Sequence, residues 1–265
     1  MSGALRPVIF DIGLHHGEDT DFYLKKGFDV VAVEADPRHV TKAKERFAGA
    51  IAEGRMEIVS AAIADEPGEI EFYVNLDKDD WGSTDPTYGT RAATRHEKIR
   101  VPAIRFDELF TRVSRQGLAG EGPRRVHYVK CDIEGGDIHV LTGLLRCPLE
   151  SRPMHLSVEA HKVEYAAYLA VMGFTRFKLV NQNLNWTQKV PNPTREGEGS
   201  GREHFEYQFK GHSSGPFGEE APGLWVSFEE VAYLYMSLKR AAASYPTISI
   251  AWYDFHAAME VVGGV

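Results

Sequence analysis

The sequence predicts an α/β protein built on an open, mostly parallel β-sheet with helices on both faces. Short apolar runs alternate with helical segments over the first 180 residues, and no internal repeat is apparent. The length of 265 residues and the hydrophobic content of 43% suit one large domain with embellishments. We therefore expect a single core with loops and short elements added to it.

The first quarter of the chain contains two strand–helix units. Gly27 follows the first helix, where a left-handed residue can end it. Asp36 and Pro37 start the second helix, as a capping carboxylate and a proline at the first helical position. The predicted elements are a strand at 7–10, a helix at 18–26, a strand at 29–33 ending before Glu34, and a helix at 36–51.

The next part of the chain continues this alternation and adds a hairpin. Glu66-Pro67-Gly68 is a turn between a strand and a second strand whose alternation suggests one wet face. Gly135-Gly136-Asp137 opens a helix, and Gly173 caps another. The predicted elements are strands at 56–63 and 69–74, a short strand and helix within 104–113, a strand at 126–131, a helix from 135, a strand at 155–161, a helix at 163–172 and a strand at 174–180.

The C-terminal part departs from the alternation. Residues 181–223 are rich in Gly, Pro, Ser and Asn, and a segment this long without periodicity is usually a functional loop or lid. Ser227 and Glu230 form a capping-box pattern that starts a helix, and a last strand is predicted from Thr247. We thus divide one domain, 1–265, into a core at 1–180, a long loop or lid at 181–226 and a helix and strand at 227–265.

Composition excludes several classes of function. A net charge of -8 argues against binding to nucleic-acid backbone or anionic membrane, since both require a cationic surface. Cys131 and Cys147 are the two cysteines, too few for a disulfide framework. No leader segment or membrane-length apolar run is present in the sequence, and we expect a cytoplasmic protein.

The turn after the first strand reads Asp11-x-Gly13-x-His15-x-Gly17. Ligands of open parallel sheets bind at the carboxyl ends of the strands, where this turn is expected. Glu34 ends the second strand and can accept hydrogen bonds from both hydroxyls of a ribose. The turn lacks the G-x-G-x-x-G spacing of dinucleotide sites, and Asp11 can hold a cationic amino group. These residues favour an amino-acid-bearing nucleoside such as S-adenosylmethionine.

Three motifs resemble those of the FkbM family of class I S-adenosylmethionine-dependent methyltransferases. The turn with Thr20 resembles the family's Asp-x-Gly-Ala-Asn-x-Gly opening, and "AVEADP" resembles the end of its second strand. Val129-Lys130-Cys131-Asp132-Ile133-Glu134-Gly135-Gly136-Asp137 resembles its Ile-Lys-x-Asp-x-Glu-Gly signature. "IRFDELF" and "SVEAH" also have counterparts in the family. The resemblance covers residues 7–180.

The resemblance implies a Rossmann-like, doubly wound, mostly parallel seven-stranded sheet, the class I methyltransferase fold, with an inserted β-hairpin and a C-terminal lid and helix extension. It implies O-methylation of a small-molecule hydroxyl, on a sugar or a polyketide-like metabolite. The predicted cofactor-binding residues are Asp11, Gly13, His15, Gly17, Thr20, Glu34, Ala35, Ala62 and Asp132.

Methyl transfer needs alignment of the acceptor and removal of its proton. Candidate catalytic residues are Asp132 and Glu134, just past a strand end, and Glu159 and His161, two apart at another strand end. His161 is the preferred general base because imidazole accepts a proton near neutral pH. The alternative role of Glu134 is a cap on the following helix. Asp132 and Glu159 are also candidate ligands for Mg²⁺ or Mn²⁺.

His15 stands where the family usually has Asn, and His16 is also unusual there. A metal site made from the two is one interpretation, but adjacent turn residues seldom point at one ion. We favour exposed turn histidines, one of which contacts the cofactor.

Three further groups are candidates for contact with the ligands. Trp81-Gly82-Ser83-Thr84 is expected in a polar loop after the hairpin, at the cofactor or acceptor pocket or as a surface turn. In the long loop, Trp186 and residues 211–219 could form a cover that excludes water. The aromatic residues of the loop that could cover an acceptor are Trp186, Phe205, Tyr207, Phe209 and Phe217. Asp254 and His256, near the last strand, are more typical of packing.

Two rival functions remain open. One is a nicotinamide-dependent oxidoreductase on the same architecture, and the other is a cofactor-binding protein without turnover. The sequence does not identify the acceptor and leaves the oligomeric state open, a homodimer included.

Overall fold

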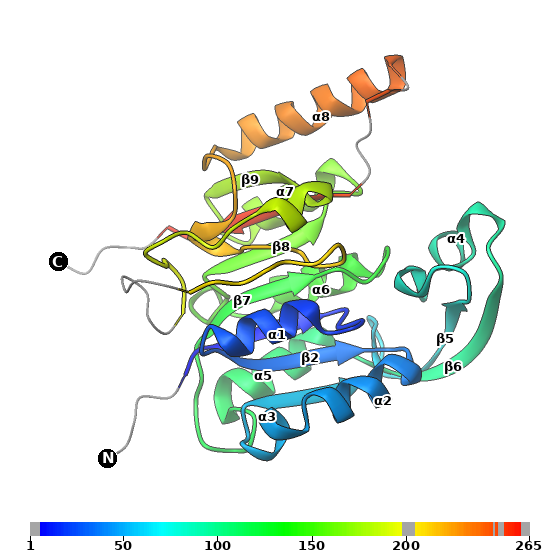
Figure 1. Ribbon diagram of the computed structural model, residues 1–265, viewed down its shortest axis with the longest axis vertical. Coiled ribbons are helices and arrows are strands. Elements are labelled where there is room, and N and C mark those ends of the chain that lie inside the picture. The colour runs from blue at the N-terminus through cyan, green and yellow to red at the C-terminus, as the bar shows by residue number, and fades with distance from the viewer. Residues whose placement is uncertain (1–5, 198–204, 246, 249–251, 261–265) are drawn as a thin grey trace. The chain divides into compact units, whose positions relative to one another are not determined.

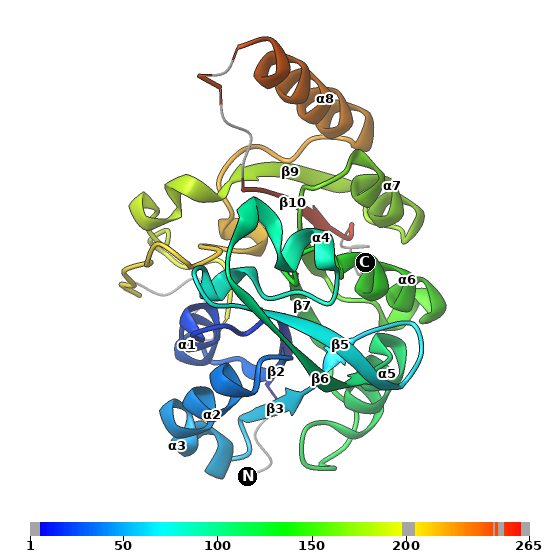
Figure 2. The same cartoon turned by 90° about the vertical axis from the view of Figure 1, so that its right-hand side faces the viewer.

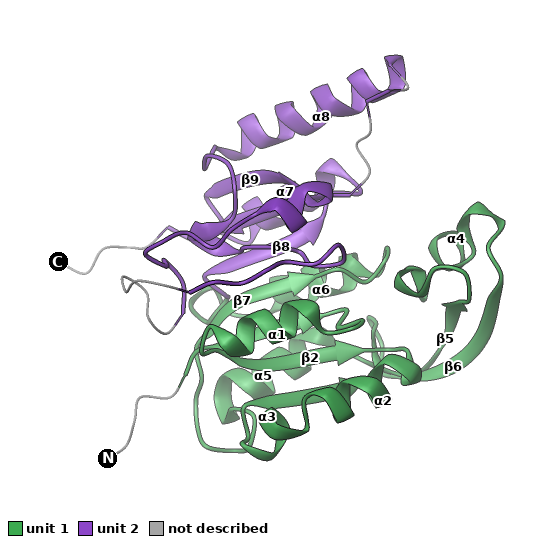
Figure 3. Ribbon diagram, viewed as in Figure 1, with its two compact units in different colours: residues 1–152 green, residues 153–265 purple. Residues whose placement is uncertain are grey.

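The computed structural model describes residues 6–197, 205–245, 247–248 and 252–260. The chain forms two compact units, residues 1–152 and residues 153–265 (Figure 3). The sequence predicts a single domain divided into a core at 1–180, a long loop at 181–226 and a helix and strand at 227–265. That division stays a prediction.

Unit 1 contains four parallel strands in the order β3-β2-β1-β7, and a second sheet in the order β4-β6-β5. Figure 2 shows α1 and α2 on one side of the parallel strands and α5 and α6 on the other. Its elements are β1 (Val8–Ile12), α1 (Glu18–Lys25), β2 (Asp29–Glu34), α2 (Pro37–Arg46), α3 (Ala48–Ala52), β3 (Met56–Ser60), β4 (Ala62–Ile63), β5 (Gly68–Asn75), η1 (Asp79–Trp81), α4 (Pro86–Gly89), η2 (Arg91–Ala93), β6 (His96–Ile104), α5 (Phe106–Gln116), β7 (Val126–Cys131), α6 (Asp137–Arg146) and η3 (Leu149–Ser151).

The predicted helix signals of unit 1 are confirmed. The Asp36 side chain accepts a hydrogen bond from the backbone N–H of Arg38 at 2.8 Å, and Pro37 is the first residue of α2. Gly27 follows α1 with a φ of 86°. The core forms where β1 meets the helices, with the Phe10 ring 5.5 Å from that of Phe106.

The single strand predicted at 56–63 is instead two strands in different sheets. β3 pairs with β2 up to the partners Glu34 and Ser60, and Ala62 then begins β4, which pairs with β6. Ala61 lies between them and donates its N–H to the carbonyl of Glu34 at 3.0 Å. The sequence of the run does not reveal this change of partner, because pairing with β2 or with β6 depends on the path of the chain.

The hairpin of unit 1 projects from the parallel strands (Figure 1). β5 and β6 pair antiparallel from Gly68 opposite Ala103 to Asn75 opposite His96. The connection between them, residues 76–95, contains η1, α4 and η2 and is called the insertion below. The predicted hairpin, with its turn at Glu66-Pro67-Gly68, is therefore wrong, because β4 and β5 are not neighbours and each pairs with β6. Residues 81–84, expected after that hairpin, lie between β5 and β6.

Unit 2 contains three strands in the order β8-β10-β9, with β10 antiparallel to both neighbours. Its elements are β8 (His155–Glu159), α7 (Val163–Val171), β9 (Arg176–Asn181), η4 (Gln182–Thr187), η5 (Gly218–Glu220), α8 (Phe228–Ser244) and β10 (Tyr253–Ala258). The capping box of Ser227 and Glu230 at the start of α8 is confirmed. The start of the predicted last strand lies partly outside the described residues.

The two units supply the predicted α/β fold, with four parallel strands from unit 1 and three strands from unit 2 in the central sheet. The single antiparallel strand, β10, makes this sheet mostly parallel rather than wholly so. No helix within the described ranges is both long and apolar enough to cross a bilayer.

Candidate functional site

The turn after β1 has a backbone that requires glycine. Gly13 has a φ of 91°, and a Cβ there would lie 1.9 Å from the carbonyl oxygen of Asp132. Gly17 has a φ of 78°, and its Cβ would meet the ring of Phe47 at 2.6 Å. The glycines therefore let the turn pack directly against the end of β7 and against Phe47, the residue that follows α2. They also leave backbone without side chains at the carboxyl ends of the strands.

Asp11 supports this turn from within the protein. Its side chain has no exposed surface, and Oδ2 accepts a hydrogen bond from Thr20 Oγ1 at 2.6 Å. Lys130 Nζ lies 3.4 Å from Oδ1. The sequence-based prediction gives Asp11 direct contact with a cationic amino group, whereas this placement makes Asp11 and the equally buried Thr20 positioning residues.

Lys130, on β7, joins the turn to three carboxylates. Its ammonium donates to the carbonyl of Gly13 at 2.8 Å and lies 3.7 Å from Asp132 and 3.9 Å from Asp19. Burial alone would lower the pKa of Lys130, but Asp11, Asp132 and Asp19 together hold it well above its usual value. Lys130 is therefore a permanent cation beneath the turn.

Glu34 ends β2 beside the same turn. Oε2 accepts the backbone N–H of His15 and Oε1 that of Asp36, both at 2.8 Å. Burial raises the pKa of Glu34, although these two donors oppose the shift. The residue is 8% exposed, and each carboxylate oxygen keeps a lone pair that a hydroxyl group can use.

Ala35 and Ala62, the remaining predicted cofactor contacts in unit 1, lie at one apolar cluster. Ala62 is buried with Phe72, Val74 and Val101, and Ala35 packs against them while staying half-buried. Ala35 is half-buried and lies next to Glu34 in the sequence, so a ligand can reach it more easily than the buried Ala62.

Glu134 is held by the insertion. Arg91 donates to both of its carboxylate oxygens, at 2.6 and 2.8 Å, and the guanidinium lies 4.0 Å from the ring centre of Trp81. Ser83 Oγ donates to the carbonyl of Glu134 at 2.7 Å. The segment 81–84 and Arg91 thus fix the loop after β7. The positive charge of Arg91 balances the negative charge of the Glu134 carboxylate.

Asp137, the first residue of α6, ties the backbone of the same loop to the helix. Asp137, not Glu134, accepts backbone hydrogen bonds from Ile133 and Gly135, at 3.2 and 3.1 Å. Gly136 is at the N-cap of α6, so the alternative capping role of Glu134 is wrong. The side chain of Asp132 is 30% exposed and is the accessible carboxylate of this loop.

Glu159 and His161 meet in unit 2, as predicted from their spacing. Glu159 Oε2 lies 3.0 Å from His161 Nε2, and the hydroxyl of Tyr235 on α8 donates to the carbonyl of His161 at 2.8 Å. Asp132 belongs to unit 1, so a site that it shares with Glu159 and His161 stays a prediction. The divalent cation between Asp132 and Glu159 stays a prediction as well.

The long segment between β9 and α8 is anchored within unit 2. Phe209 and Phe217 are buried, whereas the side chain of Trp186 is 58% exposed. Glu196 accepts the backbone N–H of Glu219 at 2.8 Å, which ties two parts of the segment together. Residues 198–204 of this segment lie outside the described ranges. Of the predicted covering aromatics, Trp186 is exposed, Phe205 and Tyr207 are half-buried, and Phe209 and Phe217 belong to the core.

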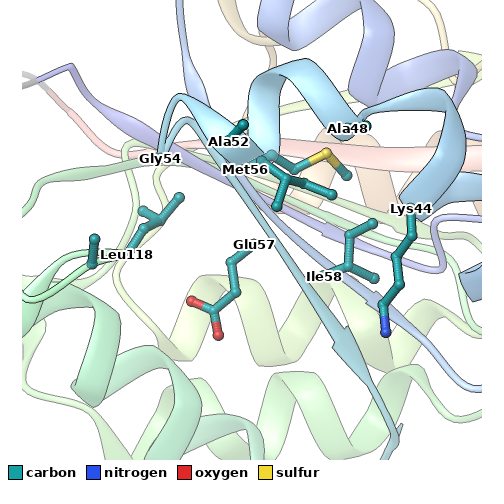
Figure 4. Close-up of a pocket in the computed structure, with 10 residues that line it drawn as sticks. Lys44, Ala48, Ala52, Gly54, Met56, Glu57, Ile58 and Leu118 are labelled. Carbon is teal, nitrogen blue, oxygen red and sulfur yellow. The ribbon is translucent and has the colours of Figure 1, made fainter.

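A hollow of about 620 Å³ lies elsewhere in unit 1 (Figure 4). It is lined by the start of β3, by α2 and α3, and by Leu118 and Ala119. Met56 and Glu57 place it at the amino end of β3, opposite the carboxyl ends where ligands of such sheets bind. We do not assign it to the cofactor.

Several structurally important residues escape the sequence analysis. Lys130 lies within the quoted third motif, and a lysine in a buried strand is itself a signal that carboxylates surround it. Arg91, His39 and Asp79 carry no such signal, because their partners are far away in the sequence. The insertion brings Asp79 and Arg91 to the turn and the loop after β7.

Comparison with known proteins gives one family match. Residues 11–186 match the Methyltransferase FkbM domain. No curated protein sequence matches the chain.

Several solved structures are similar to the chain. Methyltransferase FkbM from Methylobacillus flagellatus KT is 17% identical with a TM-score of 0.42, over 68% of this chain and 42% of that one. A SAM-dependent methyltransferase from Thiobacillus denitrificans in complex with S-adenosyl-L-homocysteine is 10% identical, TM-score 0.36, over 97% and 86%. The glycopeptide N-methyltransferase MtfA complexed with S-adenosylmethionine is 11% identical, TM-score 0.31, over 98% and 90%. The chain thus spans less than half the length of the Methylobacillus protein.

Proposed function

Because the chain belongs to the FkbM methyltransferase family, we propose that it transfers a methyl group from S-adenosylmethionine to a hydroxyl of a small molecule, a sugar or a polyketide-like metabolite. The observation that carries the proposal is the pair of carboxylates beside the Gly13 turn, the nearly buried Glu34 and the partly exposed Asp132. Bound S-adenosylmethionine supplies a sulfonium methyl group for in-line displacement.

The residues of the turn fit this cofactor. Glu34 presents two acceptor oxygens to the ribose diol, and Gly13 offers backbone without a side chain. We assign the cationic amino group to Asp132 rather than to the enclosed Asp11, because Asp132 has exposed carboxylate surface. His15 lies beside Glu34, where its backbone N–H orients the carboxylate.

We assign proton removal from the acceptor to His161. Glu159 lies 3.0 Å from its imidazole and orients the ring, and a carboxylate partner stabilises the protonated imidazole that forms. Glu134 is unsuited to this role, since Arg91 binds both of its oxygens. The segment at 181–226 is assigned to acceptor binding, with Trp186 as its exposed aromatic contact.

A divalent cation held by Asp132 and Glu159 is the alternative means of positioning the acceptor. Lys130 Nζ lies 3.7 Å from Asp132 and already supplies positive charge, so we propose transfer without Mg²⁺ or Mn²⁺. Adding either ion to chelator-treated enzyme should leave turnover unchanged. Turnover that is lost in chelator and restored by Mg²⁺ or Mn²⁺ would reinstate this cation site.

The test of the proposed function compares cofactors and then follows the methyl group. Isothermal titration should give binding of S-adenosylmethionine and none of NAD, and labelled methyl should appear on a hydroxyl of a product from a metabolite library. His161→Asn should lower kcat by about 10²–10⁴ with cofactor Kd unchanged. Tight NAD binding would favour the oxidoreductase, and cofactor binding without transfer to any library member would favour the non-catalytic binder.

A further inference from the structure

Four side chains with metal-binding atoms meet beside the glycine turn of unit 1. They are His15 and His16 in the turn, His39 on α2, and Asp79 at the start of η1 in the insertion, and we call them the His–Asp cluster. Their candidate ligand atoms all lie within 4.8 Å of one another. Neither the family match nor the proposed methyl transfer accounts for this cluster.

The three imidazoles converge on Asp79 through the same ring atom. His16 Nε2 lies 2.9 Å from Oδ2 of Asp79, and His15 Nε2 lies 3.4 Å from Oδ1. His39 Nε2 lies 3.3 Å from the backbone carbonyl of Asp79. Three nitrogen donors and a carboxylate therefore surround one small volume.

Backbone geometry explains how two adjacent histidines point the same way. His15 has a φ of 50°, in the left-handed region that non-glycine residues rarely adopt. Its ring stacks on that of His16, with centroids 3.8 Å apart and planes 22° apart. The expectation that neighbouring turn residues diverge therefore fails here.

The His39 ring completes the arrangement from a different element. Its centroid lies 4.7 Å from that of His15 and 5.2 Å from that of His16, both edge-on. His39 is buried, and α2 fixes its backbone. Donors from a turn, a helix and an inserted loop are the kind of set that a tetrahedral ion links.

We propose that the His–Asp cluster is a site for a transition-metal ion of the Zn²⁺ class, bound by three histidines and one aspartate. Nitrogen and carboxylate donors at about 2.0–2.2 Å suit tetrahedral Zn²⁺, and donors so bound lie about 3.4 Å apart. The separation of His15 Nε2 from Asp79 Oδ1, 3.4 Å, already equals that value. Imidazole donors favour Zn²⁺ or Co²⁺ over Mg²⁺ and Ca²⁺, which prefer all-oxygen sites.

The electrostatics of the cluster suit a cation. Its three imidazoles supply nitrogen donors, which bind a metal ion in their neutral form. Asp79 adds a carboxylate, whose negative charge favours a bound cation.

Such an ion would tie the insertion to the cofactor turn. Asp79 belongs to the insertion, and His15 donates its backbone N–H to Glu34, the proposed ribose ligand. Occupancy of the site therefore fixes the conformation of the turn from outside, as Lys130 does from inside. The proposal does not depend on the proposed methyl transfer, since the ligands form the site without any cofactor.

The experiment measures metal binding to the chelator-treated full chain without S-adenosylmethionine. Wild type should bind one Zn²⁺ in isothermal titration, and Co²⁺ should give the intense visible absorption of a tetrahedral site. His39→Ala and Asp79→Asn should each weaken Zn²⁺ binding at least about tenfold. The matched control is His139→Ala, which removes a partly exposed histidine paired with Asp65 in the same unit.

Circular dichroism shows whether each variant folds. Asp79→Asn alters an exposed loop residue and keeps the test valid if His39→Ala does not fold. Zn²⁺ binding as tight in Asp79→Asn as in wild type, or a Co²⁺ spectrum typical of octahedral oxygen ligands, would overturn the proposal. Equal weakening by His139→Ala would do the same, because it would place the ion elsewhere.

Discussion

Lys130 in unit 1 and Lys178 in unit 2 are both buried, but their electrostatic surroundings are opposite. Lys130 on β7 lies among Asp11, Asp19 and Asp132, which hold its pKa well above the usual value. Lys178 on β9 donates to the carbonyl of Ala221 and lies 4.2 Å from the ring centre of Trp225. Burial lowers the pKa of Lys178 to about 8, with Glu219 opposing the shift and Arg176 reinforcing it.

The difference shows how the two units use buried charge. In unit 1 the lysine is a fixed cation that holds the glycine turn in place by a hydrogen bond to Gly13 and by contacts with three carboxylates. In unit 2 burial outweighs the charge of Glu219 at Lys178, and at His256 it is reinforced by Lys178 and His155, so both groups hold a proton less tightly than usual. Unit 1 is therefore preorganised electrostatically, whereas the interior of unit 2 is sensitive to pH.

The largest expected effect follows from removing the fixed cation. Lys130→Met leaves Asp11 buried without its cation and should lower the free energy of unfolding by about 3–5 kcal/mol in urea titrations. Lys178→Met, the matched control, loses one hydrogen bond and should cost about 1 kcal/mol. Equal losses in the two variants would remove the distinction between the lysines.

A smaller effect is expected at Glu34, the proposed ribose ligand, which accepts a hydrogen bond from the backbone of the glycine turn. Glu34→Ala should weaken S-adenosylmethionine binding by about 1.5–3 kcal/mol, or about 10- to 150-fold in Kd, as measured by calorimetry. Glu69→Ala, on the exposed hairpin, is the control and should bind normally. Unchanged affinity in a folded Glu34→Ala protein would contradict the role of the turn as the cofactor site.

The sequence predicts most of the fold because local signals decide it. Asp36 and Pro37 begin α2, and Ser227 with Glu230 begins α8, as capping chemistry requires. The break between β3 and β4 was not predictable, since it depends on which strand Ala62 pairs with, and both choices bury the same apolar side chain.

The candidate site was predictable where motif position decides it. Gly13 and Glu34 follow strands whose carboxyl ends must meet, so the sequence places both at one edge. It does not show that Asp11 is buried, because a motif gives no information on burial. It missed the convergence of His39 and Asp79 with the turn, since that depends on the path of the insertion and on the left-handed backbone of His15.

The pH dependence of stability should follow the buried bases of unit 2. Burial, with Lys178 and His155, lowers the pKa of His256 to about 3 from 6.5. Below pH 6.5 the unfolded chain therefore binds a proton that the folded chain does not, and stability falls as pH drops towards 3. The slope from this residue is at most about 1.4 kcal/mol per pH unit.

His256→Phe should flatten that acid limb in urea titrations at pH values below 6.5. Lys130 cannot contribute to it, because a raised pKa gives a contribution that is lost only as pH rises. His139→Ala is the control for general histidine loss in unit 1. An acid limb unchanged in His256→Phe would show that the interior of unit 2 does not govern the sensitivity.

The smallest effect is expected at the exposed aromatic of unit 2, where it separates acceptor binding from cofactor binding. The backbone at Trp186 is fixed, because its carbonyl accepts from Gln208 at 3.1 Å and the preceding Asn185 is buried and donates to Ser213 at 3.1 Å. Its side chain is nevertheless 58% exposed, which leaves a large apolar surface for an acceptor to cover. Covering part of it contributes about 1 kcal/mol, so Trp186→Ala should raise the acceptor's KM about fivefold with the cofactor Kd unchanged.

Leu149→Ala in unit 1 is the control, because it removes a side chain that is also 58% exposed and should leave both constants unchanged. If Trp186→Ala weakens cofactor binding instead, the segment serves the nucleotide, and the assignment of cofactor to unit 1 and acceptor to unit 2 fails.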